Sequence, residues 1–252
     1  MLSNLGAKDF KEINRYEAQE ARQGVAVDDE HFYAIGNHYL GKYLRSDGSK
    51  LAEWACEEGK PLIHLNAGMI VGDKLYCSHS NYPGVPATSS IEIFDTANLK
   101  HIGSYSLGHG YGSLTWIDRR DGKWYACFAF YGNRAKEPGR DPNWTQVVEF
   151  DNEWRRLRAW TFPPELVEKF GEYSCSGGAF GPDGRLYITG HDHPELYVIE
   201  FPEAGSIFRW VDTLSIPAEG QAFAWDTLEE WTLFTIIKAD RVIIVSRANH
   251  QS

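Results

Sequence analysis

The 252-residue chain has few of the features that mark several protein classes. It has four cysteines, none of them in a CxxC pair or at the spacing of a zinc site, so we expect reduced thiols within strands. No stretch is long and apolar enough to cross a bilayer, and the first residues lack the apolar core of a signal peptide. These absences predict no membrane partner and a cytoplasmic location, unless a leader has been removed from the chain.

Basic residues are also scarce. Lys and Arg number 25 against 35 Asp and Glu, which gives a formal net charge of −10. Nucleic acids and anionic membranes are bound by basic surfaces, so no nucleic-acid partner is expected. The chain has no GxSxG motif, no P-loop and no GxGxxG that opens a helix. This argues against serine-hydrolase, nucleotide and dinucleotide chemistry.

Aromatic residues and glycine are abundant, and they recur in a pattern. Nine Trp, 13 Tyr, 13 Phe and 24 Gly favour β structure over a helical bundle. Short apolar runs follow one another at intervals of 44, 44, 66 and 44 residues. The runs are GVAV from Gly24, GMIV from Gly68, GSLTW from Gly112, GAFG from Gly178 and AFAW from Ala222. This period is the first evidence for a repeat architecture.

Each repeat continues in the same order. A polar turn leads to an apolar residue followed by tyrosine, then to an alternating run such as IEIFDT, then to a turn and a fourth run such as HIGSYSL. Four short strands joined by tight turns, with a period in the forties, are typical of a β-propeller blade. An open β-sandwich is the alternative, but it does not explain the repeat. The segment Pro164–Glu172 is the one short helical candidate.

The fifth repeat lacks its fourth strand. The N-terminal segment FKEINRYE, from Phe10 to Glu17, is an unassigned strand that supplies it. Pairing of this segment with the last repeat would close the ring and remove exposed sheet edges. The sequence therefore predicts one domain over residues 1–252, an all-β five-bladed propeller of four-stranded antiparallel blades.

Polar residues gather at one predicted face. Strands alternate in direction within a blade, so the start of strand one and the end of strand two share a face, here called the top. His64 and Asn66 open the second repeat, and His79 and Asn81 close its second strand. The same rule, with the long loops of the second and third repeats, predicts a pocket at the top of the ring. Further members of the set are Gln23, His38, His109, Tyr111, His191, His193 and Gln221.

Two chemistries fit this His- and Asn-rich mouth. In one, a divalent metal ion such as zinc is held by imidazoles and activates water. Its ligands would be His64, His79, His109 and His193. In the other, no metal takes part and a histidine moves a proton. The catalytic candidates are His64, His79, His109 and His191.

The remaining polar groups of the mouth would bind the substrate. They are Gln23, His38, Asn66, Asn81, Tyr82, Tyr111 and Gln221. Both chemistries predict an enzyme acting on a small polar molecule, of hydrolase (lactonase) or lyase (cyclase) type. The alternative is a propeller scaffold that binds a small ligand or a protein without catalysis.

The repeats resemble the broad propeller group that contains the senescence-marker lactonases and NHL-type repeats. The likeness covers the whole chain and includes GPDGRLYITG, from Gly181 to Gly190. It implies a propeller fold, and for the lactonases a metal held by carboxylates and asparagines, where this chain offers histidines. Locally, Arg22–Tyr43 is similar to the first blade of propeller-type glutaminyl cyclotransferases, with their QG opening. Those enzymes place a glutamate in strand two, where this chain reads Tyr33-Ala34-Ile35.

Overall fold

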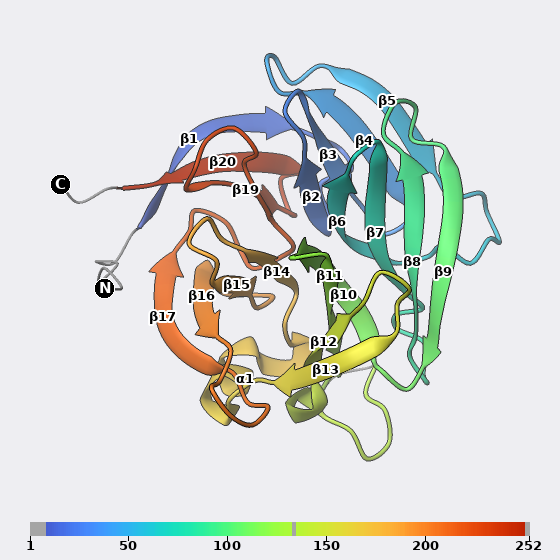
Figure 1. The fold of residues 1–252 in the computed structure, drawn as a ribbon. Helices are drawn as coiled ribbons and strands as arrows, with labels where there is room; N and C mark the ends of the chain where they lie inside the picture. The colour runs from blue at the N-terminus through green and yellow to red at the C-terminus, as the bar shows by residue number, and fades with distance from the viewer. Residues whose placement is uncertain (1–8, 133–134, 250–252) are drawn as a thin grey trace.

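Five four-stranded antiparallel sheets form a closed ring (Figure 1), in a computed structural model that describes residues 9–132 and 135–249. Blade 1 holds β2 (Gly24–Val27), β3 (His31–Ile35), β4 (Tyr39–Leu44) and β5 (Lys50–Ala55). Blade 2 holds β6 (Leu65–Val71), β7 (Lys74–Ser80), β8 (Thr88–Asp95) and β9 (His101–His109). Blade 3 holds β10 (Ser113–Arg120), β11 (Lys123–Ala129), β12 (Gln146–Phe150) and β13 (Arg156–Thr161).

Blade 4 holds β14 (Gly177–Phe180), β15 (Leu186–Thr189), β16 (Glu195–Glu200) and β17 (Arg209–Ser215). Blade 5 holds β18 (Ala224–Trp225), β19 (Thr232–Ile237), β20 (Val242–Ala248) and β1 (Phe10–Glu17). The predicted five-bladed all-β propeller is therefore confirmed.

The two ends of the chain meet in blade 5. Strand β1 lies antiparallel to β20, with Phe10 opposite Ala248 and Glu17 opposite Val242. Figure 1 shows the first and last strands side by side at the rim. The strand predicted from FKEINRYE has the same bounds as β1. Closure by the N-terminal segment is thus confirmed.

Glycines at the strand-one openings let the innermost strands approach one another. A Cβ on Gly24 would lie 2.7 Å from the Cβ of Ala222, which belongs to blade 5. A Cβ on Gly178 would lie 2.4 Å from the ring of Trp116, which belongs to blade 3. Neither position has room for a larger residue without a shift, which explains why small residues recur at the hub.

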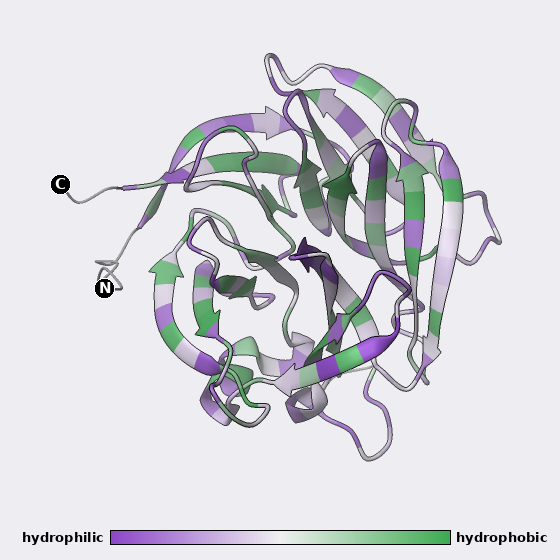
Figure 2. Cartoon of the chain, viewed as in Figure 1, coloured by the Kyte–Doolittle hydropathy of each residue, from purple (hydrophilic) through white to green (hydrophobic). Residues whose placement is uncertain are grey.

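Apolar side chains fill the spaces between blades. One cluster joins blades 2 and 3 through Ile91, Phe128 and Val148, and another joins blades 1 and 2 through Tyr33, Leu75 and other residues. Figure 2 shows the outer strands β9, β13 and β17 alternating in hydropathy, since one side of each faces solvent. The blades are therefore held by face-to-face packing of sheets.

The long third repeat forms two extra segments at the top. The first contains the 3₁₀ turn η1 (Pro142–Trp144), and the second contains the helix α1 (Pro164–Phe170) and the 3₁₀ turn η2 (Gly171–Tyr173). Leu166, Val167 and Phe170 of α1 are buried. The predicted short helix is confirmed, and its apolar face anchors the second segment to the ring.

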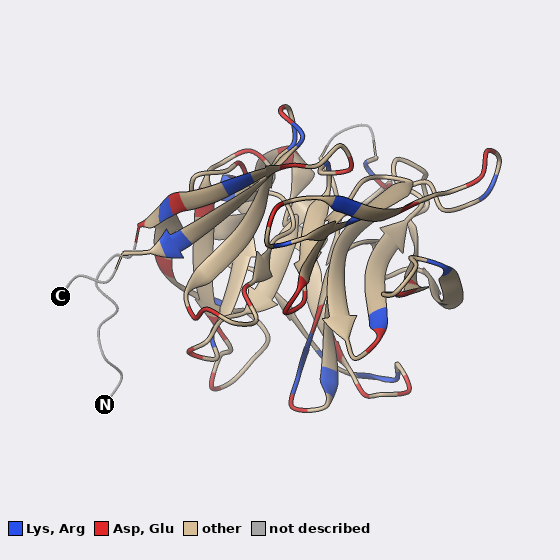
Figure 3. Ribbon diagram, turned by 90° about the horizontal axis from the view of Figure 1, so that it is seen from above, with Lys and Arg blue, Asp and Glu red and all other residues tan. Residues whose placement is uncertain are grey.

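The cysteines are reduced thiols, and the charged residues lie mostly outside the strand interiors. All four cysteines are free thiols, and Cys77, Cys127 and Cys175 are buried. Figure 3 shows Lys, Arg, Asp and Glu mostly at strand ends and in loops, which leaves the strand interiors largely uncharged. Within residues 9–132 and 135–249, no helix has the length and apolar character that crossing a membrane requires.

Ring closure gives a stability test at Phe10. This residue is the buried member of an otherwise mostly exposed strand, and its ring lies 6.0 Å from that of Trp225. We expect Phe10→Ala to lower the free energy of unfolding by about 3 kcal/mol, the lower end for a buried Phe. Lys11→Ala, an exposed neighbour on β1, should change it by under about 0.5 kcal/mol. Denaturant unfolding measures both, and equal stability of the two variants would contradict closure through this contact.

Candidate functional site

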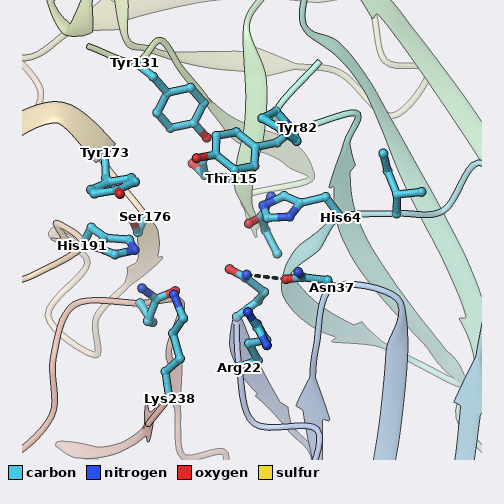
Figure 4. A pocket seen from close by; sticks show the side chains of 15 residues that line it. Arg22, Asn37, His64, Tyr82, Thr115, Tyr131, Tyr173, Ser176, His191 and Lys238 are labelled. Carbon is cyan, nitrogen blue, oxygen red and sulfur yellow. Dashed lines mark hydrogen bonds between the residues drawn. The ribbon is translucent and has the colours of Figure 1, made fainter. Parts of the chain in front are cut away.

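A cavity of about 720 Å³ opens at the top of the hub. Figure 4 shows its side chains converging from all five blades. The lining residues are Arg22, Gln23, Asn37, Ile63, His64, Asn66, Tyr82, Pro83, Thr115, Tyr131, Tyr173, Ser176, His191, Gln221 and Lys238. Its volume lies within the range of about 300–1,000 Å³ that is usual for small-molecule sites.

Most of the lining comes from two positions that every blade repeats. One is the residue just beyond the end of strand two: Asn37, Tyr82, Tyr131, His191 and Lys238. The other is the opening of strand one: Gln23, His64, Asn66, Thr115, Ser176 and Gln221. The ring symmetry therefore brings residues from distant parts of the chain to one mouth.

Hydrogen bonds fix the amide side chains of the wall. Gln23 Nε2 donates to Asn37 Oδ1 at 2.5 Å, the bond drawn in Figure 4. Asn66 is buried, and its Nδ2 donates to the carbonyl oxygen of Leu114 at 2.9 Å. Gln221 is buried as well. Because these groups are already held in place, a ligand that bonds to them orders little of the protein.

Aromatic rings form another part of the wall. The Tyr82 ring lies 5.0 Å from that of Tyr131 and 4.9 Å from that of His64. Tyr173 stacks on His191 at 4.2 Å between ring centroids. Figure 4 shows the three tyrosines on the side of the cavity away from Arg22 and Lys238. The pocket thus has an aromatic side and a cationic side.

Arg22 and Lys238 have no acidic partner. Neither makes an ion pair within the part of the chain that the structure describes, and no Asp or Glu lines the cavity. Arg22 Nε is buried without a hydrogen-bond partner among those residues. Burial, followed by Arg22, lowers the pKa of Lys238; the charges of Glu219 and Asp192 oppose this shift, and Arg241 adds to it. Two cations without an ion-pair partner are costly unless a counter-charge is supplied.

His64 is neutral at physiological pH. Burial, followed by the neighbouring His79, Lys238 and Arg22, lowers the pKa of His64 to about 4, while a hydrogen bond that His64 donates to Asn66 opposes the shift. A neutral imidazole can donate or accept a hydrogen bond but adds no positive charge. The positive charge of the mouth therefore comes chiefly from Arg22 and Lys238.

The structure brings half of the sequence-predicted residues to the cavity. Those that line it are Gln23, His64, Asn66, Tyr82, His191 and Gln221. Those that do not are His38, His79, Asn81, His109, Tyr111 and His193. The expectation that His64, Asn66, His79 and Asn81 stand together at one mouth is wrong for His79 and Asn81.

His79 lies on the opposite face of its sheet. Its neighbours on β7, Ser78 and Ser80, bond toward blade 3, to the Thr115 carbonyl and to Ser113. Successive side chains on a strand point to opposite faces, so His79 points toward blade 1 and lines a separate crevice. Its position at the end of strand two was predicted correctly, but the direction of its side chain was not.

The other predicted residues that do not line the cavity either make local contacts or are exposed to solvent. Asn81 accepts a hydrogen bond from the Thr88 N–H and donates to the Pro86 carbonyl, so it shapes its own loop. Tyr111 stacks on Phe128 at 4.9 Å. His109 is exposed at the end of β9, the outermost strand of blade 2, and does not open blade 3. His38 and His193 are also exposed, outside the cavity wall.

The lining does not fit a resident metal ion. Among the described residues, no group of three or more His, Cys, Asp or Glu side chains is arranged to hold one. His64, His79, His109 and His193 are divided between the cavity, the crevice, an outer strand and a loop. The cavity itself pairs two histidines with two cations and no carboxylate, which disfavours a divalent cation.

The prediction of the site from histidine, amide and tyrosine positions missed its charged members. Lys238 follows strand two of blade 5, the position that supplies His191 in blade 4, and Arg22 stands beside Gln23. Both were visible in the repeat alignment, but a search confined to histidine, amide and tyrosine side chains passed over them. Tyr173, in the 3₁₀ turn η2, had no repeat signal because it lies in an insertion.

Comparisons with known proteins find the fold and no family. No family model matches the chain, and no curated protein matches it. The solved structure of a luciferin-regenerating enzyme is similar over 97% of this chain and 96% of that chain, at 12% identity and a TM-score of 0.60.

Two further solved structures have lower similarity. A protein of unknown function from Bacteroides caccae has a TM-score of 0.49 and 11% identity, over 84% of this chain and 69% of that one. The WD40 β-propeller domain of Doa1 has a TM-score of 0.48 and 9% identity, over 97% of this chain and 98% of that domain. The similarity to the luciferin-regenerating enzyme shows a propeller scaffold, and at 12% identity it carries no specific activity to this chain.

Proposed function

We propose that this protein binds a small polar organic anion in the cavity at the top of the hub. The observation that carries the proposal is the pair Arg22 and Lys238, which share the cavity without any acidic residue in its lining. The chain as a whole has a net charge of −10, so a cationic cavity runs against its composition. An anion would supply the counter-charge that the described part of the protein does not.

The walls suggest how such a ligand would sit. A carboxylate or phosphate would face Arg22 and Lys238, since a guanidinium binds such groups with two parallel hydrogen bonds. Gln23, Asn37 and Gln221 would bond to neutral oxygens of the ligand. Its apolar part would contact the tyrosines on the far side (Figure 4). The favoured ligand is therefore small, anionic and partly apolar.

Turnover of the bound anion is a second proposal, favoured by the environment of Lys238. The lowered pKa of this amine increases the fraction that is neutral and able to accept a proton. In an elimination or cyclisation, Lys238 would remove a proton while Arg22 holds the anionic group. The luciferin-regenerating enzyme shares the propeller scaffold, and this likeness supports no particular reaction here.

Neutralising the two cations tests the anion site. We expect Arg22→Gln and Lys238→Gln each to weaken binding of 4-hydroxybenzoate by about tenfold, because each removes a charged hydrogen-bond donor. Isothermal titration calorimetry with 4-hydroxybenzoate, and separately with inorganic phosphate, measures the change. Lys74→Gln, at an exposed lysine that begins β7, is the matched control and should bind as the unaltered protein does. Equal affinity in all four proteins would rule the site out.

The pH dependence of binding should report on Lys238. Anion binding favours the protonated amine, so affinity should fall as the pH rises through the pKa of Lys238, which lies below the ordinary 10.5. Burial raises the pKa of Tyr131, so this phenol stays neutral over the same range. Kd measured between pH 7 and pH 10 should rise for the unaltered protein and stay flatter for Lys238→Gln. The same slope in both would exclude Lys238 as the titrating group.

A further inference from the structure

A second cavity of about 590 Å³ lies between blades 1 and 2, outside the hub. Its apolar wall includes Trp54, Pro61 and Leu62, from β5 and the segment that links it to β6. Its polar wall is the face of blade 2 that looks toward blade 1. The polar residues there are His79, Ser90, Glu92, His101, Ser104 and Ser106, and the linking segment adds the oppositely charged Glu57 and Lys60 to the lining. We call this cavity the side crevice.

Glu92 gives the side crevice a buried negative charge. Its side chain is almost wholly buried, and it accepts hydrogen bonds from Ser90 at 2.5 Å, Ser104 at 2.9 Å and His101 at 2.8 Å. No Lys or Arg pairs with it within the described ranges, and its two ion-pair neighbours there are His79 and His101. Three donors hold the carboxylate in place, but no permanent cation balances its charge.

Blade 3 shows that this polarity is not needed to pack a blade. The cross-strand pairs Cys77–Glu92 and His79–Ser90 of blade 2 match Ala126–Val148 and Phe128–Gln146 of blade 3. Phe128 and Val148 are fully buried in the apolar core between blades 2 and 3. Blade 2 thus places His79 and Glu92 where blade 3 places Phe128 and Val148. A sequence that departs from its own repeat in this costly way marks a functional position.

The hydrogen bonds fix the tautomer of His79. Ser90 Oγ donates to Glu92, so it must accept from Nδ1 of His79, which lies 2.9 Å away. The Nε2 atom then carries a lone pair, and it is buried with no hydrogen-bond partner in the described chain. Burial lowers the pKa of His79, while Glu92 and the nearby Pro61 carbonyl oppose that shift. The Pro61 oxygen accepts from the Ile63 N–H at 2.9 Å and keeps a second lone pair, so Nε2 is the acceptor that has no donor among the described residues.

We propose that the side crevice binds a small organic cation, a primary ammonium group on an apolar body. The ammonium N–H groups would donate to Nε2 of His79 and to the Pro61 carbonyl, and Glu92 would supply the counter-charge. The apolar body would lie along Trp54 and Leu62, where an aromatic face also attracts a cation. This site is separate from the anion pocket and of opposite charge preference, and it does not depend on the function proposed there.

Binding of benzylammonium, measured by titration calorimetry on the full chain, tests the site. We expect Glu92→Gln to weaken it by at least about tenfold, because the isosteric amide removes the charge and keeps the shape. Trp54→Leu should weaken it by removing the aromatic face. Glu58→Gln, an exposed neighbour outside the crevice wall, is the matched control and should leave affinity unchanged.

His79→Phe provides a second variant if Glu92→Gln fails to fold. This substitution introduces the residue that blade 3 has at the equivalent position, Phe128, so the protein should fold while benzylammonium binding is lost. Benzyl alcohol separates charge from shape and should bind at least about tenfold more weakly than benzylammonium. Equal affinity for the alcohol and the ammonium, or benzylammonium binding that survives both Glu92→Gln and His79→Phe, would overturn the proposal.

Discussion

The antiparallel pairing of β1 with β20 is the constraint on which the molecule depends. It joins segments at opposite ends of the chain and turns five sheets into a closed ring. Every group that lines the hub cavity is positioned by a strand end or a loop of that ring, so its place is only as fixed as the ring. Closure also covers the outer edge of β20 with β1, so the last strand of the chain is not left as a sheet edge that another molecule could pair with.

Ring geometry also explains why so few kinds of position make the pocket. Five strand-one openings and five strand-two ends meet at one mouth, and the inner strands approach closely enough there that glycine recurs. What differs between blades is the side chain placed at a shared backbone position. The chemistry of the site is therefore set by the side chains at these two kinds of position, where Lys238 is the charged one, and by Arg22 beside Gln23.

The fold was predictable from the sequence because its evidence is periodic. The interval of 44 residues and the unpaired strand at Phe10–Glu17 fix blade number and closure without any side-chain detail. The sequence also predicted which backbone positions line the mouth of the cavity, as His64 and His191 show. Direction was harder: successive side chains on a strand point to opposite faces, and His79, in the regular pairing of β7 with β8, faces blade 1 and not the hub. Insertions such as the one that carries Tyr173 have no repeat to align with.

His79 and His64 show how one sheet serves two sites. They are near enough that a charge on His79 helps to lower the pKa of His64, after the larger effect of burial. Yet His64 faces Arg22 and Lys238, while His79 faces Glu92. Blade 2 therefore separates a cationic cavity from a crevice with a buried carboxylate by the thickness of one sheet. Each site therefore has its own charge preference, because successive side chains of one strand point to opposite faces of the sheet.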